Sequence, residues 1–96
     1  MKSMKRSKII RACLRRDDYY AFKKLNPRDD DLPTTFDLWL DSAAKAEASL
    51  MARGRQIERV FIDPQEFAEW RGRTGFPASA VGREAFAIAK ASGRAA

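Results

Sequence analysis

The chain has no histidine and only one cysteine, Cys13, among its 96 residues. Without histidine it lacks the most common general base, the most common zinc ligand and the usual pH-sensing side chain. With a single thiol besides, the chain by itself cannot assemble a Ser–His or Cys–His nucleophile or a zinc site of the usual composition. We therefore expect a protein that is not an enzyme, with no catalytic residues, no metal-binding residues and no cofactor.

Disulfides and long apolar runs are missing as well. One cysteine cannot form a bridge within the chain, which is typical of proteins from a reducing compartment. No apolar run approaches the roughly 18 residues that cross a bilayer, and Arg11 interrupts the apolar residues near the basic N-terminus, so a signal-peptide core is absent. We expect a cytoplasmic protein with no membrane partner and no evident small-molecule substrate.

The composition that remains is that of one small globular domain. Apolar residues make up 45% of the chain, which is ordinary for a folded protein. A chain of this length has room for one modest core but not for two. We predict a single domain over residues 1–96, with residues 1–8 as a basic arm and residues 92–96 as a tail, both frayed.

The clearest local signal is a strand that runs directly into a helix. Residues 57–62 are rich in β-branched and aromatic side chains and predict a strand. Asp63 is a good helix N-cap, and Pro64 suits the first helical position. Ile62 and Phe67 have the spacing of a hydrophobic staple across that cap. We therefore predict a fixed strand-to-helix corner at this point of the chain.

The N-terminal region is predicted to be helical. Ile10, Cys13 and Leu14 recur at helical spacing, and the aspartates at 17–18 interrupt that pattern. The same aspartates are suited to cap a separate short helix over residues 19–25. One bent helix and two short helices are both compatible with these residues.

Two more helices complete the prediction. Thr34 forms a capping pattern with Asp37 that opens a long central helix, and Gly54 is suited to end it. Glu47 interrupts the apolar stripe of that helix. Ser79 is suited to cap a final helix, which we predict to continue through Ala91. We predict a core that includes Phe36, Leu40, Ala43, Leu50, Val60, Ile62, Phe67, Trp70 and Phe86, with Val81, Ala85 and Ile88 also facing inward.

The predicted fold class is α+β and mostly α. It has an N-terminal helical region, a long central helix, one strand and two C-terminal helices. A lone strand leaves its backbone N–H and C=O groups unpaired. Three outcomes stay open: a weakly signalled segment of the chain pairs with it, residues 57–62 of a second copy pair with it in a homodimer, or it is extended and solvated.

Positive charge is concentrated near the N-terminus. The formal net charge is +6, and residues 1–28 hold ten basic residues against two acidic ones. Clustered basic side chains suit a nucleic-acid backbone, although a solvated helix face gives the same pattern. No nucleic-acid-binding motif accompanies them. The candidate nucleic-acid contacts are Lys5, Arg6, Lys8, Arg11, Arg15 and Arg16.

Two other features have ordinary interpretations. The run 29–31 consists of three aspartates, and we interpret it as a solvated acidic loop because it lacks the spacing of a calcium loop. Nearby arginines would favour a thiolate at Cys13, but we expect a small buried side chain there.

The segments 31–40, 57–70 and 80–87 carry the pattern D-L-P-x-T-[FY]-x-x-W-L … [IV]-D-P-x-E-F-x-x-W followed by A-x-G-R-E-A-F-A. This pattern resembles a group of short uncharacterised bacterial proteins. In that group a cysteine often follows the last tryptophan, whereas Arg71 stands there in this chain, so a thiol role in the group would not carry over. The resemblance implies a bacterial or mobile-element origin and no known activity.

From these observations we expect a small non-enzymatic binding or accessory protein that acts through protein–protein contacts, including contacts with a second copy of itself. The alternative is a nucleic-acid-binding regulator that uses the basic N-terminal region.

Overall fold

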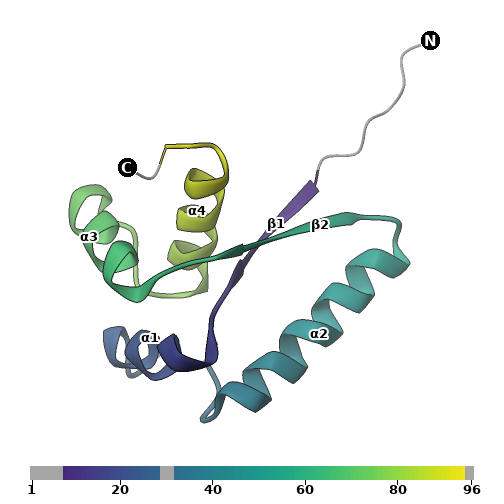
Figure 1. Ribbon diagram of the computed structural model, residues 1–96, viewed down its shortest axis with the longest axis horizontal. Coiled ribbons are helices and arrows are strands. Elements are labelled where there is room, and N and C mark those ends of the chain that lie inside the picture. Colours follow the sequence, from purple (N-terminus) through teal and green to yellow (C-terminus); the bar gives the residue numbers. More distant parts are fainter. Residues whose placement is uncertain (1–7, 29–31, 95–96) are drawn as a thin grey trace.

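Two strands pair at the centre of the molecule, with α4 on one side of them and α2 on the other (Figure 1). The computed structural model describes residues 8–28 and 32–94. The elements in chain order are β1 (Lys8–Cys13), the 3-10 turn η1 (Arg16–Asp18), α1 (Tyr19–Leu25), α2 (Phe36–Ala52), β2 (Gln56–Phe61), α3 (Pro64–Thr74) and α4 (Ala80–Ala91). The mostly helical α+β class is confirmed.

The prediction of a helix over the first apolar residues is wrong, because residues 8–13 form the strand β1. β1 lies parallel to β2, with Arg11 beside Arg59 and Cys13 beside Phe61. The predicted strand therefore has a partner within the chain, and residues 8–28 and 32–94 contain two strands where the sequence predicted one. Helices lie on both sides of this sheet, so β1 lacks the polar–apolar alternation of a half-exposed strand.

The two faces of the sheet differ in what they contact. Side chains at paired positions of parallel strands point to the same face. Ile10, Ala12 and Val60 pack against the buried core on one face. Cys13 and Phe61 lie on the opposite face, toward α2. The sequence left the inward face of β2 undecided, and the structure places Val60 on the core side.

The core is built mainly from aromatic side chains of all four helices. Phe67 lies against Phe22, Trp70 and Phe86 with ring centroids 5.6–6.5 Å apart. The buried cluster consists of Leu14, Tyr19, Phe22, Leu32, Phe36, Ile62, Phe67, Trp70, Ala78, Phe86 and Ala87. Five residues of the predicted core belong to it.

Three residues predicted to face inward are exposed instead. Leu40 is 47% exposed, Val81 is 65% exposed and Ile88 is 45% exposed. On α4 the buried side consists of Gly82, Arg83, Phe86 and Ala87. The prediction is confirmed for Ala85, which packs against the core, and wrong for Val81 and Ile88. The alanines of this helix make its apolar stripe too wide to locate from the sequence.

The predicted corner after β2 is confirmed. The Asp63 carboxylate accepts hydrogen bonds from the backbone N–H groups of Gln65 and Glu66 at 2.9 and 3.0 Å. Pro64 is the first residue of α3, and Ile62 and Phe67 are buried on either side of the cap. The chain therefore leaves the sheet and enters α3 in one fixed direction.

The ends of the other predicted helices are close to their expected places. The second of the two short helices in one N-terminal alternative, over residues 19–25, is α1, whereas the first is replaced by β1. The cap of α2 is Thr35, one residue later than predicted, and its hydroxyl accepts from Leu38 N–H at 3.2 Å. Gly54 follows α2 with a φ of +79°, and α4 ends at Ala91 as expected.

Gly82 brings α4 into close contact with the backbone of the preceding loop at Pro77. A Cβ atom on Gly82 would lie 1.8 Å from the Pro77 carbonyl oxygen. Gly72, in α3, has no neighbouring atom within 4 Å of the same position. The two helical glycines therefore have opposite roles, since only the first is required by close packing.

We expect Gly82→Ala to lower the free energy of unfolding by about 1–3 kcal/mol, because the added methyl group displaces the Pro77 backbone. Gly72→Ala is the matched control, and it should raise that free energy by about 0.5–1 kcal/mol because alanine favours the helix. Urea denaturation followed by circular dichroism measures both. Equal effects of the same sign would contradict the packing seen around Gly82.

Candidate functional site

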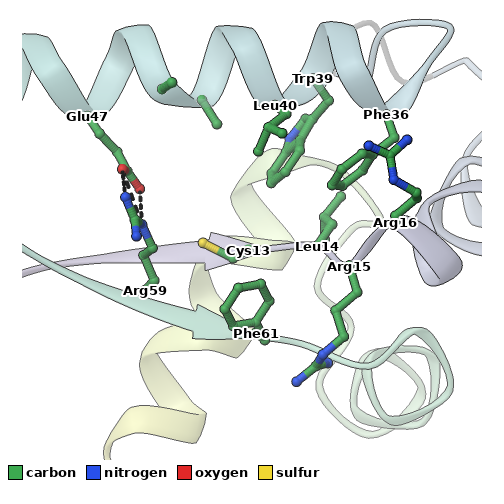
Figure 2. Close-up of a pocket in the computed structure, with 12 residues that line it drawn as sticks. Cys13, Leu14, Arg15, Arg16, Phe36, Trp39, Leu40, Glu47, Arg59 and Phe61 are labelled. Atoms are coloured by element: carbon green, nitrogen blue, oxygen red, sulfur yellow. Dashed lines mark hydrogen bonds and ion pairs between the residues drawn. The ribbon is translucent and has the colours of Figure 1, made fainter.

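A groove with a volume of about 480 Å³ opens between α2 and the sheet, beside the ends of both strands (Figure 2). We call it the α2 groove. Cys13 and Phe61 form its floor, and Trp39 and Leu40 of α2 form its wall. Its remaining lining residues are Leu14, Arg15, Arg16, Phe36, Ala43, Ala44, Glu47 and Arg59.

Large apolar side chains are exposed in this groove. Phe61 in the floor is 45% exposed, and Leu40 on the wall is exposed to nearly the same extent. Isolated apolar residues are common on protein surfaces, whereas apolar residues that share one concave surface are typical of binding sites. The α2 groove therefore has the lining of a site that takes up apolar groups.

An ion pair closes one end of the groove. Arg59 donates from Nε and Nη2 to both carboxylate oxygens of Glu47, at distances of 2.6–3.2 Å. Glu47 is 7% exposed, whereas the side chain of Arg59 is mostly open to solvent. The hydrogen bonds from Arg59 hold the pKa of Glu47 below its usual range. This pairing explains why an acid can interrupt the apolar stripe of α2.

Two arginines lie at the other end. The Arg15 guanidinium is 4.9 Å from the centroid of the Phe61 ring. The Arg16 guanidinium lies 4.7 Å from the Phe36 centroid and also donates to Asp37 at 2.9 Å. Such cation–π contacts hold the guanidinium groups over the apolar lining. The groove is therefore apolar in its middle, with the Glu47–Arg59 ion pair at one end and the guanidinium groups of Arg15 and Arg16 at the other.

Cys13 is buried in the floor, on a strand rather than on the predicted helix. Burial is the main cause that raises the pKa of the Cys13 thiol; Glu47 raises it further, and Arg59 and Arg11 lower it. The thiol is therefore protonated at neutral pH, and its chemistry is that of a small apolar side chain.

Four of the six candidate nucleic-acid contacts lie within the described residues, and they belong to different surroundings. Lys5 and Arg6 lie outside the described residues. Lys8 is exposed at the start of β1 and belongs to that strand rather than to a frayed arm. Arg11 pairs with Glu84 of α4 at 3.8 Å. Arg15 and Arg16 lie together at the end of the α2 groove. The acidic run 29–31 also lies outside the described residues.

The groove residues Leu40, Glu47, Arg59 and Phe61 were not predicted as a site. One signal for them was available in the sequence, since an acid within an apolar helical stripe needs a cationic partner. The sequence could not identify that partner, because Arg59 follows it by 12 residues in a different element.

Searches against protein-family models, curated proteins and solved structures found no match to this chain. The resemblance to the group of bacterial proteins therefore stays a prediction. Within the described residues, no helix is long and apolar enough to cross a membrane. Within the same ranges, no three carboxylate or thiol side chains come together as ligands for a metal ion.

We expect Glu47→Gln to destabilise the protein in a pH-dependent way. Folding lowers the pKa of Glu47 from about 4.5 in the unfolded chain, so its stabilising effect is present above that pH and is lost as the pH falls through the lower, folded value. The difference in free energy of unfolding between wild type and Glu47→Gln should therefore be largest near pH 7 and shrink below pH 4.5.

Urea denaturation at several pH values tests this expectation. Asp41→Asn is the control, because Asp41 pairs with Lys45 on an exposed turn of α2 and should have little effect at any pH. A Glu47→Gln effect that is equal at neutral and acid pH would contradict an ionised Glu47 in the folded protein.

Proposed function

We propose that this chain is a small non-enzymatic binding protein that acts through protein–protein contact, and that the α2 groove is where a partner docks. The observation that supports this proposal is the shared exposure of Leu40 on the wall and Phe61 on the floor of one groove. These residues come from α2 and β2, so the site exists only in the folded chain.

The free energy gained by covering the apolar lining of the α2 groove is that of a modest protein interface. Covering the exposed half of a leucine or phenylalanine contributes about 1 kcal/mol of apolar burial. The half-buried ring of Trp39 adds a third apolar surface to the same groove. Central clusters of a few apolar or aromatic side chains account for most of the affinity of typical interfaces.

The lining favours binding over catalysis for a chemical reason. Its carboxylate, Glu47, is already paired with Arg59, and its thiol is protonated. Neither group is available as a base or nucleophile near neutral pH. The proposal includes two kinds of partner: another protein, or a second copy that pairs through residues 57–62.

We expect Leu40→Ser and Phe61→Ser to weaken binding of an apolar fluorescent dye to the protein, each by about fivefold, since each removes about 1 kcal/mol of apolar contact. Both residues are half exposed, so unfolding free energies should change by no more than about 1 kcal/mol. Dye titration and urea denaturation measure the two effects. The same variants should lose any protein that wild type captures from a lysate of the source organism.

Leu38→Ser is the matched control, because Leu38 lies on the same helix, is 56% exposed and does not line the groove. It should bind the dye as wild type does. Loss of dye binding in this control, or unchanged binding in the two groove variants, would show that the α2 groove is not the binding surface.

A nucleic-acid-binding regulator is the second proposal, and the observation that favours it is the adjacent pair Arg15 and Arg16 at an exposed rim. Retention on immobilised DNA or RNA should then fall steeply with salt. Replacing both arginines with alanine should reduce the slope of log affinity against log salt by about 1–2. Lys45→Ala serves as the control and should leave the slope unchanged. If the double arginine variant also leaves the slope unchanged, this rim is excluded as the nucleic-acid contact.

A further inference from the structure

The outer edge of β2 is oriented to accept another strand. At the end of the sheet, Ile62 N–H donates to the Cys13 carbonyl at 3.1 Å, so the backbone of Ile62 points toward β1. Backbone groups alternate in direction along a strand. The N–H and C=O groups of Ile57, Arg59 and Phe61 therefore point away from β1. Within residues 8–28 and 32–94, β1 is the only strand that pairs with β2.

This edge is continuous with the α2 groove. Ile57, Arg59 and Phe61 pair in register with Ile9, Arg11 and Cys13, so their side chains share the face that lies toward α2. A strand added at this edge would place every second side chain on that face, directly beside these three residues. Backbone pairing and filling of the groove would then occur together.

We propose that the partner docks as an extended segment that pairs with the outer edge of β2 and carries the pattern apolar–x–acidic–x–apolar. This inference rests on the proposed function. The two apolar side chains lie beside Ile57 and Phe61, and the carboxylate lies beside Arg59. The segment adds a third strand, a mode of recognition in which backbone hydrogen bonds supply affinity and alternate side chains supply specificity.

The charges around the groove favour an acidic residue at the centre of the partner segment. Arg15, Arg16 and Arg59 hold three guanidinium groups around the lining, while Glu47 and Asp37 supply two carboxylates. The side chain of Arg59 is 61% exposed although it is paired, so part of its guanidinium remains open to a second carboxylate. The chain as a whole carries +6, which also favours an acidic partner.

The same reasoning disfavours a second copy of this chain as the strand. The antiparallel register that uses all three outward residues pairs Ile57 with Phe61 of the other copy and Arg59 with its own counterpart. Like charges directly opposite each other destabilise a strand pair. A foreign segment with a carboxylate at that position avoids this repulsion.

Panning a phage-displayed library of random dodecapeptides on the wild-type protein tests the proposal. We expect enrichment of apolar–x–acidic–x–apolar sequences. An enriched peptide, synthesised and measured by calorimetry, should bind at least about tenfold more weakly when lysine replaces its acidic residue. Enrichment of basic sequences, or no enrichment at all, would overturn the proposal.

Two variants at one position separate the backbone from the side chain. Arg59→Pro removes an N–H that points outward, and proline is tolerated where a strand's N–H faces solvent. Arg59→Ala keeps the N–H and loses the same ion pair. The peptide should bind Arg59→Pro about tenfold more weakly than Arg59→Ala, because only proline removes the hydrogen bond to the added strand. Equal binding would overturn strand addition.

A charge reversal keeps the test decisive if Arg59→Pro fails to fold. The double variant Glu47→Arg/Arg59→Glu retains the ion pair with opposite polarity. It should enrich a basic residue at the central position of the motif. An unchanged preference for acidic residues would show that Arg59 does not contact the acidic residue of the partner segment.

Other results would separate this inference from the proposed function. Enrichment of helically spaced apolar residues, with binding lost in Leu40→Ser, would leave the groove as a docking site but overturn the added strand. A wild-type dimer in sedimentation equilibrium that Arg59→Pro converts to a monomer would assign the edge to a second copy and overturn the foreign segment. Absence of both peptide and dye binding would overturn both proposals.

Discussion

The hydrogen bond from Ile62 N–H to the Cys13 carbonyl marks the place where β1 and β2 end together, and the rest of the fold is arranged around that pairing. Beyond it, one strand continues through Leu14 into η1 and α1, and the other continues through the Asp63 cap into α3. Both Leu14 and Ile62 enter the core there. The paired strands supply one side of the core through Ile10, Ala12 and Val60, and the floor of the groove through Cys13 and Phe61. Without the pairing, neither would form.

The groove is a consequence of a narrow sheet, which has two strands in the part of the chain that the structure describes. Neighbouring strands lie about 4.8 Å apart, whereas a helix with its side chains is about 10 Å wide. The aromatic cluster around Phe67 fills the face toward α4. On the other face, Phe36 and Trp39 pack near Tyr19, while Leu40 further along α2 finds no such cover. Its exposure follows from the narrowness of the sheet.

The ion pair between Glu47 and Arg59 fixes the far end of α2 against β2. A carboxylate as little exposed as that of Glu47 is strongly disfavoured without a partner, so the bidentate contact restricts how α2 lies over the sheet. The same contact leaves Arg59 partly open at the edge where the backbone of β2 points outward. One residue thus links the position of α2, the charge of the groove and the proposed partner strand.

Structural features that depend on residues close together in the chain could be predicted from the sequence. The Asp63–Pro64 corner, the short helix over 19–25 and the stop at Gly54 depend on groups within about four residues of each other, so residue type and spacing were enough to predict them. The strand β1 was not readable, because its pairing joins Arg11 to Arg59 across nearly fifty residues and its own apolar spacing also fits a helix. The exposure of Leu40 and Phe61 was equally hidden, since a sequence shows that a side chain is apolar but not whether anything covers it. Residue type and spacing therefore located the short helix over 19–25 and the start of α3, although they also predicted a helix where β1 lies. Only the tertiary structure decided which strands pair and which apolar surfaces stay open, because those depend on contacts between residues far apart in sequence.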